Sequence, residues 1–128
     1  MSHAKETDHV NSSPGRKFYK EQLDYLAAKD VESLVANHYN DDAVLISFDV
    51  TVKGREALRE YFRTYLERLG TLTVRSTDQF VETEDSILLE ATVTSNLGTV
   101  RVYDAFVLRD GKISYHFAGV IGPGDSSR

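Results

Sequence analysis

The feature of this sequence that most restricts its fold is a run of four β-rich stretches in the second half of the chain. They share an enrichment in β-branched and aromatic residues and occupy positions 71–84, 86–97, 99–109 and 112–121. Short turns separate them at 84–85, 96–98 and 110–111. Consecutive strands joined by such short connections form an antiparallel meander. We therefore expect one sheet to dominate the fold.

Three segments before this region have the apolar periodicity of helices. The clearest is 55–69, whose apolar side chains follow the i, i+3, i+4, i+7 rule: Leu58, Tyr61, Phe62, Tyr65, Leu66 and Leu69. Gly70 is predicted to end it. A helix that follows Pro14 has one apolar stripe, which contains Tyr19, Leu23 and Leu26. Asp30 is predicted to cap a short helix that ends at a turn formed by 40–42.

Between the short and the long helix, residues 43–48 predict a strand and 50–53 a weaker strand or extended loop. A single sheet must cover one face with helices, and long strands coil as they twist. The sequence therefore predicts an α+β domain, in which a curved, mostly antiparallel sheet packs against three helices and closes into a cone around an apolar pocket. We expect this domain to span 14–122, between a disordered leader, 1–13, and a flexible tail, 123–128.

The composition excludes several classes of function. The 128 residues include no cysteine, which excludes thiolate chemistry and cysteine metal sites and suits a reducing compartment. The net charge is −5, and basic residues alternate with acidic ones instead of clustering, so we expect no nucleic-acid binding. No apolar run is long enough to span a membrane, and the N-terminus lacks the apolar region of a signal peptide. A cytoplasmic protein without metal or cofactor is predicted.

Asp104 is an acidic residue in an otherwise apolar strand face. Strand alternation places it beside Val102 and Phe106, whereas Arg101 and Tyr103 belong to the opposite face. A lone buried carboxylate is costly and responds by pairing, by hydrogen bonding or by keeping its proton. Asp104 therefore needs a polar partner on a neighbouring strand.

The identity of that partner depends on the turn near Gly111. A two-residue turn would pair Asp104 with Phe117, whereas a three-residue loop with Gly111 as the bulge would pair it with His116. We favour the three-residue loop because it gives the aspartate a polar partner. Its register predicts an inner face made of Ser114, His116, Ala118 and Val120. The outer face would then be apolar, with Ile113, Tyr115, Phe117 and Ile121, which predicts a homodimer through the outer face of the sheet.

Two interpretations of the Asp104–His116 pair follow. It is either an acid–base pair in an apolar cup, in which His116 moves a proton while Asp104 orients it or Asp104 does the chemistry itself, or a structural hydrogen bond in a filled core. Four tyrosines could present hydroxyl groups to a ligand, namely Tyr19, Tyr39, Tyr61 and Tyr65. His38 ends the short helix and is expected to be a surface or capping histidine.

Three motifs in order resemble those of the SnoaL-like and ketosteroid-isomerase-like members of the NTF2-like superfamily. They are Tyr-Asn-Asp-Asp-Ala at 39–43, Gly-Arg-Glu-Ala-Leu at 54–58 entering Tyr61-Phe62, and Asp104 ahead of Asp-Gly-Lys-Ile at 110–113. The likeness covers residues from about 15 to 121. It implies a conical barrel, commonly a dimer, with a pocket at the open end for a small apolar molecule.

The same resemblance restricts the chemistry. Asp104 matches the oxyanion-hole aspartate of the ketosteroid isomerases, and Tyr39 matches a tyrosine of the supporting network. The position of their general base is Ser47, which cannot shuttle a proton between carbons, and Asp49 is a speculative substitute. The position of their principal oxyanion tyrosine falls near Gln22 or Leu23, so steroid isomerisation is not expected.

Two further activities of the superfamily also lack their residues. The epoxide hydrolases would need an arginine where Val102 stands and an aspartate at Ala118. The scytalone-type dehydratases use two pocket histidines, whereas His116 would stand alone. The polyketide cyclases akin to SnoaL need only an acid–base group over a preorganised substrate, a requirement that His116 with Asp104 could meet.

The sequence thus predicts a domain that binds a small, mostly apolar molecule in its cone. If it is catalytic, it would carry out cofactor-independent proton transfer, as an isomerase, cyclase or dehydratase, with His116 as acid or base and Asp104 as its partner. The predicted ligand-binding residues are Tyr19, Tyr39, Phe62, Tyr65, Val102, Phe106 and Ala118. The alternative is a non-catalytic ligand carrier or a dimerising association domain.

Overall fold

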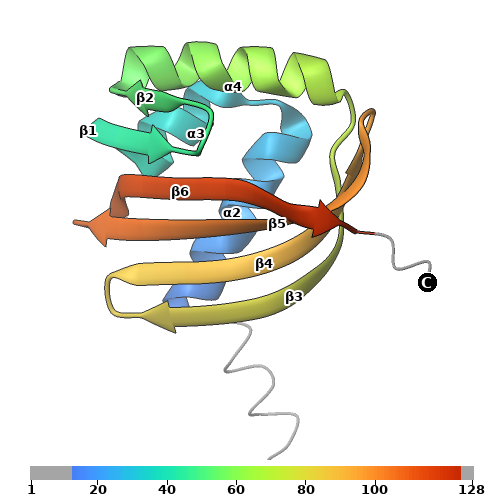
Figure 1. Cartoon of the computed structure of the whole chain (residues 1–128). Coiled ribbons are helices and arrows are strands. Elements are labelled where there is room, and N and C mark those ends of the chain that lie inside the picture. The colour runs from blue at the N-terminus through green and yellow to red at the C-terminus, as the bar shows by residue number, and fades with distance from the viewer. Residues whose placement is uncertain (1–12, 125–128) are drawn as a thin grey trace, which may run out of the picture.

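The structure, a computed structural model, describes residues 13–124 and contains three helices and six strands in that range (Figure 1). The helices are α2 (Pro14–Ala28), α3 (Val31–His38) and α4 (Arg55–Leu69). The strands are β1 (Tyr39–Ile46), β2 (Thr51–Lys53), β3 (Thr73–Thr83), β4 (Ser86–Ser95), β5 (Gly98–Arg109) and β6 (Lys112–Pro123).

The six strands form one mixed sheet in the order β2-β1-β6-β5-β4-β3. Strands β3 to β6 form the predicted antiparallel meander, and β1 joins its edge by pairing in parallel with β6. Figure 1 shows the curved sheet in front of α2, with α4 along one end. The α+β class and the mostly antiparallel sheet on three helices are confirmed. No helix in the described part of the chain is long and apolar enough to cross a membrane.

Side-chain and glycine caps set the ends of the helices. The Ser13 hydroxyl accepts a hydrogen bond from the Arg16 N–H at 3.2 Å and starts α2. Asp30 caps α3 as predicted, since its Oδ1 accepts from the Ser33 N–H at 3.2 Å. Gly70, at φ 68°, donates its N–H to the Leu66 carbonyl and ends α4.

The predicted turn at 40–42 is wrong, because β1 begins at Tyr39 and these residues belong to it. Asn40 explains the difference. Its amide nitrogen donates to the carbonyl oxygens of Arg109 and Lys112, both at 3.1 Å, and to Ser114 Oγ at 3.2 Å. The polar side chain that suggested a turn instead ties β1 to the β5–β6 hairpin.

The register of the β5–β6 hairpin differs from the predicted one. Asp110 (φ 56°) and Gly111 (φ 79°) form a two-residue turn, and Arg109 pairs with Lys112. Positive φ at both central residues is the signature of a type I′ turn, for which Asp-Gly is a preferred sequence. A bulge then leaves Ser114 without an opposite residue and shifts the register, so that Asp104 pairs with Ala118.

The bulge also changes which β6 side chains face the core. Ile113, predicted to be outside, is fully buried, and Val120, predicted to be inside, is 65% exposed. His116 is buried as predicted, while Tyr115 and Phe117 are exposed on the outer face as predicted. Two adjacent inward residues, Ile113 and Ser114, are possible because a bulge interrupts the alternation of the strand.

The core lies between the inner face of the sheet and the three helices. Its fully buried side chains come from every layer and include Leu34, Leu45, Leu58, Ile87 and Ile113. The predicted leader and tail lie mostly outside the described residues. Of their described residues, Ser13 caps α2, Pro123 ends β6 and the Gly124 N–H donates to the Thr99 carbonyl.

Candidate active site

Asp104 and His116 form a hydrogen bond on the inner face of the sheet. His116 Nε2 lies 2.7 Å from Asp104 Oδ1. Phe106 is the residue directly opposite His116, and Asp104 lies two residues along β5 on the same face. The contact is therefore a diagonal one across the hairpin, which long side chains can bridge. The two predicted partners meet, although neither register considered from the sequence is the one that brings them together.

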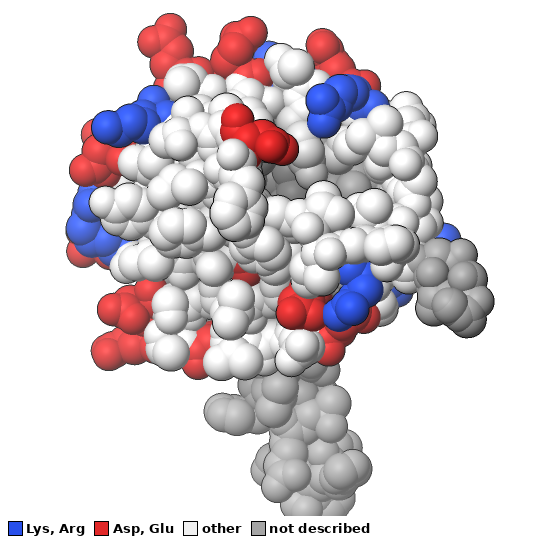
Figure 2. Space-filling view, viewed as in Figure 1, with Lys and Arg blue, Asp and Glu red and all other residues white. Residues whose placement is uncertain are grey.

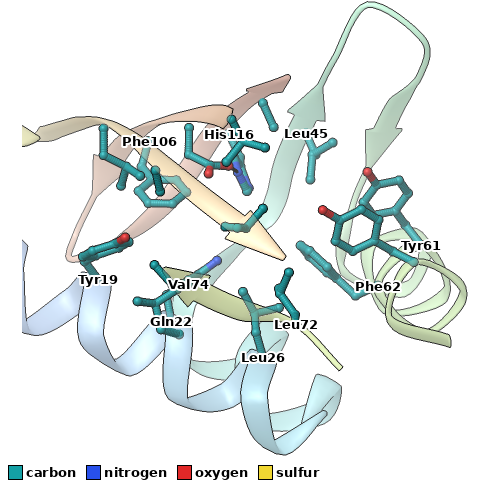
Figure 3. A pocket seen from close by; sticks show the side chains of 18 residues that line it. Tyr19, Gln22, Leu26, Leu45, Tyr61, Phe62, Leu72, Val74, Phe106 and His116 are labelled. Carbon is teal, nitrogen blue, oxygen red and sulfur yellow. Dashed lines mark hydrogen bonds and ion pairs between the residues drawn. The ribbon is translucent and has the colours of Figure 1, made fainter. Parts of the chain in front are cut away.

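The pair lies at the wall of a small, mostly apolar cavity of about 100 Å³. Figure 3 shows side chains from α2, α4 and the sheet converging on it. Its wall includes eight of the nine predicted site residues: Tyr19, Phe62, Tyr65, Val102, Asp104, Phe106, His116 and Ala118. The rest of the wall is apolar apart from Gln22 and Tyr61. The ninth predicted residue, Tyr39, is fully buried behind His116.

A second, more open cavity of about 590 Å³ lies next to the first. The two share Tyr61, Tyr65, Val102, Asp104 and Ala118, so Asp104 lies at their boundary. The outer cavity is also lined by the loop between β1 and β2, including Ser47 and Asp49, and by Arg68 of α4. Figure 2 shows a hollow between α4 and the sheet in a largely uncharged face. Drug-sized ligands occupy pockets of roughly 300–1,000 Å³, a range that the outer cavity reaches.

The two members of the pair differ in access. His116 is 5% exposed, whereas the Asp104 side chain is 28% exposed. Both ring nitrogens of His116 are occupied, because Tyr39 Oη lies 2.9 Å from Nδ1. When Nδ1 accepts from the Tyr39 hydroxyl, Nε2 carries the proton and donates to the Asp104 carboxylate. This tautomer supports an ionised Asp104.

Polar contacts continue from Tyr39 to the protein surface. Gln22 Nε2 donates to Tyr39 Oη at 3.0 Å, and Gln22 Oε1 lies 2.7 Å from His38 Nδ1. His38 Nε2 lies 3.1 Å from Oε1 of Glu21, which is 62% exposed. A chain of five hydrogen bonds therefore connects the cavity to solvent on α2.

Tyrosine hydroxyls remain protonated around the cavity. Burial raises the pKa of Tyr39, and it raises the pKa of Tyr65 to about 12. Burial also raises the pKa of Tyr61 and Tyr19, and the Tyr19 hydroxyl is hydrogen-bonded to Thr77 Oγ1 at 2.8 Å. The Tyr61 and Tyr65 rings stack at 5.7 Å, and neither hydroxyl has a hydrogen-bond partner among residues 13–124. Both are available to donate to a ligand.

Three residues of the chain of hydrogen bonds were not predicted as site residues, namely Gln22, His38 and the exposed Glu21. His38 is 3% exposed, so its assignment as a surface or capping histidine is wrong. Its ring stacks on Phe18 at 3.8 Å, which explains how a histidine at a helix end becomes buried. Gln22 lies three residues after Tyr19 in the apolar stripe of α2, and this polar residue in an apolar stripe was the available signal.

No group of three or more His, Cys, Asp or Glu residues within 13–124 is arranged to hold a metal ion.

The sequence and the fold both have known counterparts. Residues 19–116 match the family described as the SnoaL-like domain, whereas no curated protein matches the chain. An NTF2-like protein from Anabaena variabilis has 20% sequence identity and a TM-score of 0.73 over 88% of this chain and 93% of that one. A candidate polyketide cyclase from Sinorhizobium meliloti has 16% identity and a TM-score of 0.71 over 80% and 94%. TerC, co-crystallised with polyporic acid, has 16% identity and a TM-score of 0.70 over 84% and 92%. At such identities the structural likeness shows the fold alone, and it confirms the NTF2-like architecture.

Proposed function

The chain belongs to the SnoaL-like domain family, and we propose that it binds a small, mostly apolar carbonyl compound in its cone and catalyses cofactor-independent proton transfer on it. One observation carries the proposal. The Asp104–His116 pair, joined at 2.7 Å, faces a mostly apolar cavity, and Asp104 also lines a larger cavity next to it. An acid–base group beside an apolar cavity wall is suited to removing a proton from a carbon atom next to a carbonyl group.

Asp104 is the group that we assign to the proton transfer itself. It lies at the boundary of the two cavities, and Oδ1 alone is engaged with His116. His116 has both nitrogens occupied, so it is suited to orienting the carboxylate and supporting its charge. Of the two assignments that the sequence left open, this proposal takes the one in which Asp104 does the chemistry itself, instead of the one in which His116 is the acid or base.

Tyr61 and Tyr65 supply the second requirement, a donor for the oxygen on which negative charge develops. Their hydroxyls are unpaired among the described residues, and the pKa of Tyr65, raised to about 12, keeps its proton in place at neutral pH. A hydrogen bond from a protonated hydroxyl stabilises an enolate more than the parent carbonyl. Both rings line both cavities, so a ligand touching Asp104 lies within their reach.

Isomerisation, cyclisation and dehydration can each begin with this proton abstraction. The site therefore supports this class of reactions without selecting one of the three. The names of two structurally similar proteins agree with carbonyl-containing ligands, since one is a candidate polyketide cyclase and another was crystallised with polyporic acid. We extend that ligand class to this chain by proposal.

A non-catalytic carrier is the second candidate function. The smaller cavity, of about 100 Å³, lies below the usual range for ligand pockets, and it admits only part of a ligand held mainly in the outer cavity. A carrier would bind the same compounds without exchanging their protons.

Hydrogen–deuterium exchange at carbon distinguishes the two functions. The probe is 2-tetralone, whose C1 protons lie between a carbonyl and an aromatic ring. We expect the wild-type protein to accelerate their replacement in D2O, followed by the loss of the C1 proton signal in NMR spectra. Asp104→Asn should abolish the acceleration, since an amide cannot accept the proton, and general-base catalysis contributes about 10²–10⁴-fold.

The matched control is Asp24→Asn, which removes an exposed carboxylate on α2 that pairs with Lys20 outside the cavities. It should exchange like the wild type. Saturable binding without acceleration would favour the carrier, and equal acceleration by Asp104→Asn would contradict the role given to this residue.

A homodimer through the outer sheet face is the association that we propose. One row of apolar side chains crosses five strands there, with Ile46, Phe117, Ala105, Leu88 and Val81 paired in sequence. In the next row Tyr115 stacks beside Phe117 at 6.3 Å. Exposed apolar surface of this extent favours a protein interface.

A further inference from the structure

The chain of hydrogen bonds from Asp104 to Glu21 has a direction, because each bond needs one hydrogen, and all five bonds form together only when one of the two histidines is charged. Its members in order are Asp104, His116, Tyr39, Gln22, His38 and Glu21. Tyr39 and Gln22 are buried at 0% and 3% exposure, so neither has water as an alternative partner. The donor at each step is therefore decided by its neighbours.

With Gln22 as the structure places it, the chain fixes both histidines in opposite tautomers. The amide nitrogen donates to Tyr39 Oη, which leaves the hydroxyl proton for His116 Nδ1 and puts the His116 proton on Nε2. The amide oxygen accepts, so His38 must carry its proton on Nδ1. In the neutral form Nε2 has no hydrogen for Glu21, so the His38–Glu21 hydrogen bond forms only when His38 is charged, whereas burial lowers the pKa of His38 and favours the neutral form.

A charged His116 requires the opposite direction. The imidazolium would donate from both nitrogens, to Asp104 and to Tyr39. The Tyr39 hydroxyl must then donate to the Gln22 oxygen, so the Gln22 amide turns and its nitrogen faces His38. His38 accepts on Nδ1 and keeps its proton on Nε2, from which it donates to Glu21. Charging both histidines without turning the amide would leave the Tyr39 proton unpaired in the core, which is costly.

We propose that Gln22 is a positioning residue that determines the protonated form of His116 and links it to His38, so that only one of the two histidines carries a charge at a time. The role deepens the proposed function, since it sets the form of the group that supports Asp104. The linkage itself is a property of the unliganded protein and is tested without turnover.

The chain of hydrogen bonds is the main polar connection between the two histidines. Besides Tyr39 and Asp104, the cavity beside His116 presents Tyr19 from α2 and Tyr61 and Tyr65 from α4. His38 faces Glu21 and Tyr25 of α2. Near the end of α3, Arg55 and Lys112 both donate to the carbonyl oxygen of Ala36, and Arg55 also donates to that of Tyr39. Asp104 and Glu21 are thus the charged groups in direct contact with the rings.

The first test is the tautomer of each histidine in the wild-type protein, measured by long-range ¹H–¹⁵N correlation in the side chains above their titration range. We expect His116 to carry its proton on Nε2 and His38 on Nδ1. Because this measurement needs no substitution, it does not depend on whether a variant folds. Finding both protons on the same ring position would overturn the proposal.

The second test changes Gln22 in two opposite ways. Gln22→Glu offers only acceptors to Tyr39 and His38, so it favours a charged His116, and the titration midpoint should rise by about one pH unit or more. Gln22→Met cannot accept the Tyr39 proton, so charging His116 would leave that proton unpaired. Its midpoint should fall by about one pH unit.

The methionine variant separates linkage from simple charge effects, because Met and Gln are both neutral. A His116 midpoint in Gln22→Met equal to that of the wild type would overturn the proposal. If the midpoints move as expected but none of the proteins exchanges 2-tetralone protons, the linkage stands and the proposed function fails.

Discussion

At the scale of single residues, the burial of polar side chains changes their pKa values. His38 is the clearest case, since burial against Phe18 and Tyr25 lowers its pKa below the ordinary value of 6.5. In the unfolded chain this histidine takes up a proton near pH 6.5, whereas the folded protein takes it up only at lower pH. The unfolded state then binds more protons, so the free energy of unfolding falls as the pH drops below about 6.5.

Urea denaturation between about pH 7.5 and 5.5 tests this prediction. The wild type should lose stability towards acid more steeply than His38→Gln, which keeps a hydrogen-bonding amide but no titrating ring. Parallel slopes for the two proteins would contradict it.

The buried polar residues were only partly predictable. Asp104 was identified because it interrupts an alternating apolar strand face, a pattern that is visible over a few residues. Gln22 interrupts a helical stripe in the same way, but a single glutamine in an amphipathic helix also fits at the edge of the buried face. The burial of His38 depends on Phe18, and packing between two helices leaves no local trace in the sequence.

At the scale of elements, the β5–β6 hairpin decides whether Asp104 and His116 meet. Its type I′ turn needs Gly111 at φ 79°. An alanine in the left-handed region costs roughly 1–2 kcal/mol, so Gly111→Ala should lower the free energy of unfolding by about that amount. Urea denaturation is the measurement.

Gly122→Ala is the matched control for this substitution. Gly122 also lies at β6, a Cβ there meets nothing within 4 Å, and its φ is outside the left-handed region. It should be nearly neutral. Equal losses in both variants would show that the turn conformation is not the cause.

The elements themselves were predicted well, and the register was not. The boundaries of α4 follow from its apolar periodicity and Gly70, and the meander follows from its turns. The hairpin register depends on a bulge at Ser114 that Asn40 holds from another strand. Asn40 is far from Ser114 in the sequence, so the residues of the hairpin alone do not predict the bulge. The predicted register placed Asp104 directly opposite His116, whereas the two side chains meet diagonally.

At the scale of the whole molecule, the curved sheet presents two different faces. The concave face holds the cavities, and the outer face carries the apolar row that contains Phe117. We expect a dimer in light scattering and predict that Phe117→Asp or Tyr115→Asp shifts it to the monomer, since a buried unpaired carboxylate is unfavourable.

Leu97→Asp is the control for the dimer, because Leu97 is 62% exposed in the turn between β4 and β5. It should leave the mass unchanged. Unchanged mass in Phe117→Asp and Tyr115→Asp as well would exclude this face as the interface.

The cone and its helical cover were predictable from the order of elements, because few topologies close a long meander over three helices. The division of the interior into a small cavity and a larger one was not predictable. It depends on how Tyr61 and Tyr65 stack between the two, which is a property of packed side chains.

The proposed function requires the Asp104–His116 pair to line a ligand site. Side-chain NMR of His116 during titration with 2-tetralone tests it most directly. We predict a saturable shift of the His116 ring resonances. Saturable binding that leaves the His116 resonances unmoved would place the ligand elsewhere and contradict the claim.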